Sequence, residues 1–266
     1  MSDVTAHPSA GWARWQRSWW YHAVLYARTW RGSVISTAVF PLLFLAAMGV
    51  GVGHLVSQHA GRVQGLSYLD FIAPGLLATT AMQIGEGEST WSVLGAVKWQ
   101  RTYHAAISTP LEPEDVLLGK LSWVGTRALA TGVIYTVIIG LFGALHSWWA
   151  LSLPLVATLI ALAFAAPLVA WTCTLENEGA LITFYRFAIV PMFLFSATFY
   201  PVSAYPGYLR PLVQLAPLYH GVALARAGAD GHGSLGALSA HVAVLGVMAV
   251  AGLLWGRHTL RRRLVN

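Results

Sequence analysis

The sequence predicts an all-α integral membrane protein with six transmembrane helices, and three observations lead to that prediction. The 266-residue chain is 56% hydrophobic and only 10% charged, whereas soluble domains carry roughly 25% charged residues. Several apolar segments are longer than the roughly 20 residues that a helix needs to cross the bilayer. Lysines and arginines gather at both ends of the chain and in one internal loop. Because such residues mark the cytoplasmic side, both termini are expected inside.

Residues 1–31 are expected to be a cytoplasmic N-terminus that contains an interfacial helix at 11–31. This stretch carries five tryptophans and four arginines, a composition typical of an amphipathic helix on a membrane surface. It is too charged to span. No long apolar region with a cleavage site follows the arginines, so no cleaved signal peptide is expected.

The membrane domain is expected to cover 32–258, with spans at about 32–61, 67–95, 114–145, 151–174, 180–200 and 238–256. Gly49 and Gly53 form a GxxxG pair in the first span, a pattern that favours close helix packing. Pro113 is expected to open the third span, with Glu114 and Asp115 in its first turn, where acids suit the helix dipole. A basic cytoplasmic tail at 259–266 ends the chain.

The segment 200–236 is expected to form short re-entrant helices on the outer side. Its apolar pieces are too short to cross the membrane, because prolines interrupt them at Pro201, Pro206, Pro211 and Pro217. Non-helical backbone at membrane depth is tolerated only where protein or a water-filled cavity shelters it. A plain surface loop is the alternative.

Residues 98–115 are a polar island between two long apolar segments. A helix over 98–108 would place Trp99, Tyr103 and Ile107 on one stripe, with Lys98, Arg101 and His104 on the other faces, and Pro110 would end it. Such a helix can lie on the bilayer surface or dock into a groove of a soluble partner. An ordinary solvated loop is again the alternative.

Charged residues fall inside several predicted spans. Isolated charges at membrane depth cost at least a few kcal/mol, so they normally pair or face a cavity. We therefore expect an inner-leaflet layer in which a cation pairs with an acid, drawn from Glu86, Glu88, Arg127 and Arg186. The alternative is snorkelling to the interface, which is the favoured interpretation for Lys120.

Motifs for catalysis are absent from the sequence. The chain has no G-x-x-x-x-G-K-[ST] phosphate-binding loop, no G-x-S-x-G elbow and no clustered cysteines and histidines, and Cys173 is its single cysteine. No basic patch interleaved with aromatics points to nucleic acid. The chain is therefore expected to be no enzyme, to hold no cofactor or metal, and to bind no nucleic acid.

Four ordered stretches of the chain resemble ABC-2 type permeases. They are YLDFIAPGLLATTAM at 68–82, QRTY at 100–103 with DVLLG at 115–119, PMFLFS at 191–196 with FYPV at 199–202, and APLYH at 216–220 leading to Arg226. Within that family the chain is similar to permeases of lipo-oligosaccharide (nodulation-factor type) and daunorubicin-type drug exporters. The chain departs from the family in Ala197, where glycine is usual, and in Glu86, an acid additional to Glu88.

The resemblance implies a permease subunit of an exporter in the cytoplasmic membrane, paired with a second copy or a close paralogue. Separate ATPase subunits would bind ATP and Mg. Residues 98–108 would be the coupling helix that contacts the ATPase, 11–31 the connecting helix, and 200–236 the re-entrant helices. The implied cargo is an amphipathic molecule such as a lipid-linked saccharide, a glycolipid or a hydrophobic drug.

Two other classes of function compete with an exporter subunit. An ion- or proton-coupled secondary carrier would use Glu86, Glu88 and Arg127 as a relay, and it would show inverted repeats, which the sequence lacks. An intramembrane enzyme acting on lipids would need a nucleophile or metal set, which the sequence also lacks.

Overall fold

The computed structural model describes residues 13–30, 32, 39, 42–53, 63 and 65–265. Most of the predicted first span and Arg62 lie outside the described residues. The described part is helical, with a single isolated bridge between Val63 and Leu66. The prediction of an all-α fold is confirmed.

The helices follow one another along the chain in this order: α1 Arg14–Ala27, η1 Ala46–Val52, α4 Tyr68–Ser89, α5 Trp91–Leu94, η2 Gly95–Trp99, α6 Thr102–Ile107, α7 Pro113–Leu141, η3 Trp148–Ser152, α8 Leu153–Thr172, α9 Gly179–Phe184, η4 Tyr185–Ile189, α10 Val190–Phe195, η5 Val202–Ala204, α11 Arg210–Leu215, α12 Pro217–Asp230 and α13 Leu235–Val265.

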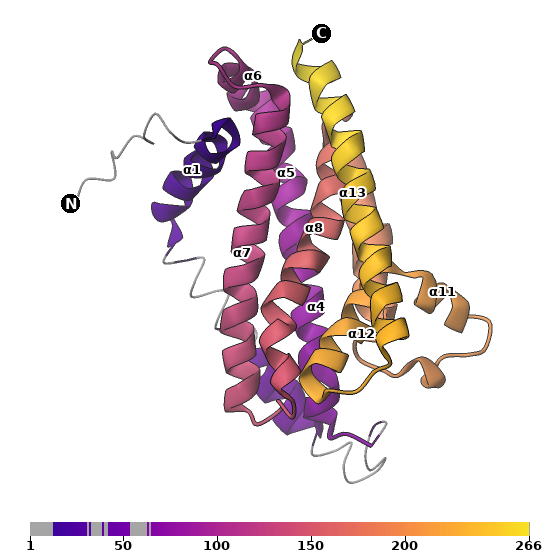
Figure 1. Cartoon of the computed structure of the whole chain (residues 1–266). Coiled ribbons are helices and arrows are strands. Elements are labelled where there is room, and N and C mark those ends of the chain that lie inside the picture. The colour runs from indigo at the N-terminus through magenta and orange to yellow at the C-terminus, as the bar shows by residue number, and fades with distance from the viewer. Residues whose placement is uncertain are drawn as a thin grey trace.

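Helix α8 is the centre of the bundle, and α4, α7 and α13 pack around it (Figure 1). Two glycines permit this close packing. A Cβ at Gly85 would lie 2.4 Å from the carbonyl oxygen of Ala161, and one at Gly252 would lie 2.3 Å from the nitrogen of Pro167. Both distances are too short for any larger residue. Gly85 therefore lets α4, and Gly252 lets α13, approach the backbone of α8.

Three of the described helices are long and apolar enough to cross a membrane: Pro113–Leu141, Trp148–Thr172 and Leu235–Val265. The first of them begins at Pro113 with Glu114 and Asp115 in its first turn, as predicted. Helix α4 carries three acids, and the helical stretch Gly179–Phe195 is shorter than a full span. Six spans therefore remain a prediction.

Two predicted spans differ from the structure in their ends. The second span is not one helix to residue 95, because Thr90, with ψ −93°, breaks it before α5 and η2 carry the chain on to Trp99. The fifth ends at Phe195 rather than at 200, because Ala197 has φ 61°, a left-handed conformation that a helix cannot contain.

The predicted basic tail at 259–266 is not a separate segment. Helix α13 continues without a break to Val265, so Arg261, Arg262 and Arg263 stand on its last turns. Basic side chains there complement the negative end of the helix dipole, which favours continued helix over a frayed tail.

Helix α1 packs along α7, at the end of the bundle where α6 and the C-terminal end of α13 lie (Figure 1). The rings of Trp19, His22 and Tyr26 pack against the ring of Trp123 on α7, at centroid distances of 6.2, 6.3 and 5.4 Å. The indole of Trp19 also donates to Thr126 Oγ1 at 3.0 Å. An aromatic contact therefore fixes the predicted interfacial helix to the bundle.

The segment 200–236 contains η5, α11 and α12, with short non-helical links between them. Helix α12 packs against α4, α8 and α13, and its Leu218, Val222 and Ala225 are fully buried. It lies towards the end of the bundle opposite α6 (Figure 1). A plain surface loop is therefore excluded for this helix.

Candidate functional site

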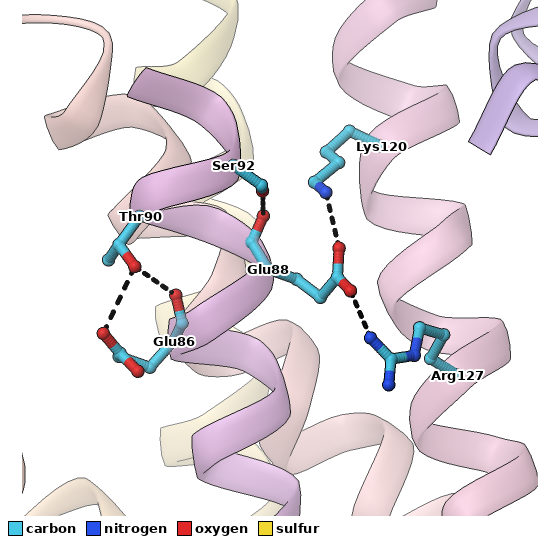
Figure 2. Close-up of polar contacts among 6 residues, drawn as sticks. All are labelled: Glu86, Glu88, Thr90, Ser92, Lys120 and Arg127. Atoms are coloured by element: carbon cyan, nitrogen blue, oxygen red, sulfur yellow. Dashed lines mark hydrogen bonds and ion pairs between the residues drawn. The ribbon is translucent and has the colours of Figure 1, made fainter. Parts of the chain in front are cut away.

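Glu88 on α4 is bound by two cations from α7, as Figure 2 shows. Lys120 Nζ lies 2.6 Å from Glu88 Oε2, and Arg127 Nη1 donates to Glu88 Oε1. Lys120 and Arg127 are seven residues apart, so they lie about two turns apart on one face of α7, and the carboxylate reaches between them. We call Glu88, Lys120 and Arg127 the charge triad.

The favoured interpretation of Lys120 was wrong. Lys120 is only 2% exposed, so its ammonium does not snorkel to the surface. Burying an ammonium is costly unless it is paired, and Glu88 supplies the partner. The sequence offered a usable signal, because Lys120 and Arg127 have the spacing of one helix face.

The other two residues of the predicted charge layer lie outside the triad. Glu86 is buried but turns away from Glu88 and accepts a hydrogen bond from Thr90 Oγ1 at 3.2 Å (Figure 2). Arg186 is exposed in η4, and no ion pair joins it to any described residue. Glu86 cannot join Glu88 in the triad because residues two apart on a helix face different directions.

A cavity of about 640 Å³ opens beside the triad, between α1, the α4–η2 region and α7. The triad forms its charged wall. Tyr21, Leu25, Trp91 and Trp99 also line it, and each of these four is 42–55% exposed. The cavity is therefore amphipathic, with a charged interior and an apolar, accessible rim.

His22 on α1 is the histidine that lines this cavity. Burial, with the charge of Lys120 adding to it, lowers the pKa of His22 to about 3. His22 is therefore neutral at pH 7, and it adds no charge to the cavity.

The predicted helix over 98–108 is not continuous. Lys98 and Trp99 belong to η2, Arg101 has φ 52°, and α6 begins only at Thr102. The left-handed turn at Arg101 rotates the two halves relative to each other. The expected stripe of Trp99, Tyr103 and Ile107 is consequently lost.

The three stripe residues have different surroundings. Tyr103 is 4% exposed and packs in a core cluster that includes Val97, Val116 and Leu260. Ile107 is half-buried against the same cluster, and His104 is also half-buried. Trp99 is 55% exposed, and Lys98 and Arg101 are exposed as well. Of the six predicted contact residues, the exposed ones are therefore Lys98, Trp99 and Arg101.

Glu176, in the loop between α8 and α9, connects this segment to α13. The Lys98 ammonium donates to the Glu176 carbonyl, and the Arg263 guanidinium donates to the Glu176 carboxylate. The hydrogen bond from Arg263, with its charge, lowers the pKa of the Glu176 carboxyl. We call Lys98, Glu176 and Arg263 the loop clasp.

Arg226 on α12 is a partly buried cation to which the sequence assigned no role beyond the family resemblance. Its guanidinium donates to the carbonyls of Phe71, Ala197 and Thr198 at 3.1, 2.6 and 3.1 Å, and it lies 3.7 Å from the centroid of the Phe71 ring. The signal that could have found it is a lone arginine among apolar residues in a proline-broken segment.

The GxxxG pair is only partly described. The side-chain surroundings of Gly49 lie outside the described residues, and a Cβ at Gly53 would meet Tyr68 at 3.8 Å, an ordinary contact. Within the described ranges, no three His, Cys, Asp or Glu residues gather as metal ligands would.

Comparison with known proteins places this chain in a family. The model described as ABC-2 type transporter matches residues 13–229, from α1 to the end of α12. Nodulation protein J of Rhizobium meliloti (strain 1021) is 30% identical over 264 residues, with 98% of each chain covered. Nodulation protein J of Rhizobium leguminosarum bv. viciae is 29% identical over 259 residues, 97% of each chain.

A relative with a functional name is more distant. The inner membrane transport permease YadH of Escherichia coli (strain K12) is 24% identical over 211 residues, which cover 79% of this chain and 80% of YadH. The match to the family model runs through the described helices from α1 to α12, and it agrees with the multi-pass apolar bundle. The chain therefore belongs to the ABC-2 type transporter family of membrane permeases.

Proposed function

We propose that this chain is the membrane subunit of an exporter that is driven by ATP hydrolysis on separate ATPase subunits. The family match over residues 13–229 is the observation that carries the proposal. The chain has no phosphate-binding loop of its own, so energy must reach it through contact with a partner that binds ATP and Mg. A second copy or a close paralogue would complete the pathway.

The proposed topology has six spans in the cytoplasmic membrane with both termini inside. The arrangement of the bundle supports it, because α6 and the arginine-rich end of α13 lie at the same end (Figure 1). Basic residues favour the cytoplasmic side, so this end would face the cytosol. Helices α11 and α12 would then be the re-entrant helices of the outer half, with α12 sheltered by α4, α8 and α13 and α11 packed against α12.

The proposed contact with the ATPase is the exposed surface at Lys98, Trp99 and Arg101. Buried tryptophans and arginines dominate the binding energy of many interfaces, and Trp99 has apolar area available for burial. The two cations would orient the encounter. Tyr103 and Ile107 would support this surface from beneath rather than contact the partner.

The proposed cargo is an amphipathic molecule such as a lipid-linked saccharide, a glycolipid or a hydrophobic drug. Resemblance to exporters of such molecules and the amphipathic cavity beside the charge triad support it. Among the described residues, no contact favours the secondary carrier instead. Both carboxylate oxygens of Glu88 already bind cations, and Glu86 binds Thr90, so neither acid is arranged as a relay.

Replacing one tryptophan tests the proposal. In the reconstituted complex with the ATPase, Trp99→Ala should weaken binding of the ATPase by about tenfold or more and reduce cargo-stimulated ATP hydrolysis. Trp148→Ala is the matched control, because Trp148 is 90% exposed and lies in η3, outside this surface. Equal ATPase binding and stimulation in Trp99→Ala and the native chain would contradict the proposed contact.

A further inference from the structure

Two histidines join α12 to α13, away from the charge triad and its cavity. His220 stands in the first turn of α12 and His241 in the second turn of α13, and their Nδ1 atoms lie 2.7 Å apart. Neither ring takes part in an ion pair among the described residues. The two helices pack together towards the end of the bundle opposite α6 (Figure 1). We call His220 and His241 the histidine pair.

The short distance between the two rings fixes how protons are placed on them. One ring must donate its Nδ1–H and the other must accept at Nδ1, so the two Nδ1 atoms cannot both carry a proton while the hydrogen bond lasts. Neutral imidazole is the commonest metal ligand in proteins, through either ring nitrogen. The histidine pair therefore presents the same nitrogen of two such ligands towards one point.

The surroundings of the pair position the rings without enclosing them. The ring of Tyr219 packs edge-on against both imidazoles, at centroid distances of 5.6 Å from His220 and 5.9 Å from His241. Both histidines are half-buried. Because neither ring is fully covered, an ion and its bound waters can approach the pair.

We propose that the histidine pair binds a zinc ion through both Nδ1 atoms and thereby links α12 to α13. Zinc binds imidazole nitrogen at about 2.0–2.1 Å, which sets two nitrogens of a tetrahedral site about 3.3 Å apart. The two Nδ1 atoms therefore need to separate by only about 0.6 Å. The proton of the donating ring moves from Nδ1 to Nε2, so the pair binds the ion without a net loss of protons. Water fills the remaining coordination positions.

The type of ligand selects zinc over the commoner divalent cations. Mg²⁺ and Ca²⁺ take oxygen ligands, whereas imidazole suits zinc and the neighbouring transition metals. Two protein ligands are fewer than the three or four of most zinc sites, so binding should be weaker than at those sites. The sequence indicated no metal because His220 and His241 are 21 residues apart and meet only in the fold.

The experiment titrates Zn²⁺ into the purified, tag-free, full-length chain in neutral detergent and follows binding by calorimetry. Zn²⁺ should bind to the native chain and Mg²⁺ should not. His220→Ala and His241→Ala should each weaken zinc binding by about 10–100-fold or more, because even the loss of a group that only orients a ligand costs that much. His146→Ala is the matched control and should bind as the native chain does. His146 also lies beside α12, through a backbone hydrogen bond to Ala229, but its ring pairs with Asp70.

Two further substitutions separate a metal site from a purely structural hydrogen bond. Asparagine can keep a hydrogen bond to His220, but its amide is not a zinc ligand, whereas cysteine supplies a thiolate that zinc binds. His241→Asn should therefore lose zinc binding, and His241→Cys should retain it. Zinc should raise the midpoint of thermal unfolding of the native chain and of His241→Cys, and leave that of His241→Asn unchanged. Unfolding without zinc shows whether each variant is folded.

Any of four results would overturn the proposal. They are no zinc binding by the native chain, binding that survives both alanine changes, a loss in His146→Ala as large as in the pair variants, or equal binding by His241→Asn and His241→Cys. Binding that survives both alanine changes would identify an adventitious ion on other residues. The measurement uses neither the ATPase nor cargo, so its failure is distinguishable from failure of the proposed exporter function.

Discussion

Two cation sites in the described part of the bundle are stabilised in different ways. Arg226, on α12, is satisfied by backbone, since three carbonyls from two segments accept its hydrogen bonds. Lys120 and Arg127, on α7, share a side chain, the Glu88 carboxylate. The first site joins α12 to α4 and to the non-helical residues after α10. The second joins α4 to α7 and borders a cavity.

The two sites therefore differ in whether backbone or a side chain satisfies the cation. Carbonyl oxygens carry no full charge and are fixed by the chain, so the Arg226 site is specific for one guanidinium. It holds the left-handed turn at Ala197 in place. The Glu88 carboxylate, by contrast, is a side chain that joins two cations of α7, and it lies on the wall of a cavity. The following changes would break or sharpen this contrast, beginning with the largest expected effect.

Glu88→Leu should be the most damaging, because it leaves Lys120 and Arg127 buried without their acid. Breaking a buried ion pair by removing one partner costs about 3–5 kcal/mol. Thermal unfolding in neutral detergent measures this loss of stability. The triple change Glu88→Leu, Lys120→Met and Arg127→Leu should recover most of that loss. If the triple variant unfolds as readily as the single one, the triad is not an isolated electrostatic unit.

Arg226→Met should cost about 2–4 kcal/mol, because three carbonyls lose their donor together. The same unfolding measurement applies. Arg210→Met is the matched control: Arg210 also donates to backbone carbonyls, of Tyr205 and Ser203 at 2.9 and 3.0 Å, but it is exposed to solvent. Arg210→Met should lower the free energy of unfolding by less than about 1 kcal/mol. Equal effects of the two substitutions would show that burial does not set the difference.

Gly252→Ala tests the close packing of α13 against α8, the central helix of the bundle that holds both sites. The added Cβ would lie 2.3 Å from the nitrogen of Pro167, so α13 must move away, at about 1–3 kcal/mol. Gly246→Ala on the same helix meets nothing within 4 Å and should be neutral or slightly stabilising. A neutral Gly252→Ala would mean that α13 and α8 are not in close contact.

Glu176→Gln should have the smallest effect, confined to acidic pH. The folded protein holds the pKa of Glu176 below its ordinary value of 4.5, so this carboxylate stabilises the folded state above about pH 4.5. That contribution disappears as the pH falls through the lowered pKa. The native chain should lose stability over this window more steeply than Glu176→Gln does. If the stability of the native chain and of Glu176→Gln fell in parallel with pH, the loop clasp would not be a stabilising contact.

The sequence predicted features that follow from composition and from local rules. The helical bundle, a helix within 11–31 and the start of α7 at Pro113 depend on such rules, and the structure confirms them. The features that the sequence did not predict depend on single backbone angles. The left-handed turn at Arg101 turns Tyr103 into the core and leaves Trp99 outside, and helical periodicity contains no sign of it.

The candidate site was predictable in its residue types but not in its pairing. Depth arguments singled out Glu86, Glu88, Arg127 and Arg186 as costly charges. Which acid meets which cation depends on the rotation of α4 against α7, and Thr90 alters α4 only a few residues away. Lys120 was misjudged because burial, rather than position along the helix, decides whether a long side chain reaches water.

Helix α13 has 31 residues, so it is about 46 Å long at 1.5 Å per residue. The hydrocarbon core of a bilayer is about 30 Å thick. The helix therefore exceeds the thickness of that core by nearly three turns, and Arg263 near its C-terminal end is tied to Glu176. A tilt imposed on that helix from the aqueous side would be transmitted along its whole length, because no proline or left-handed residue divides it to absorb the motion.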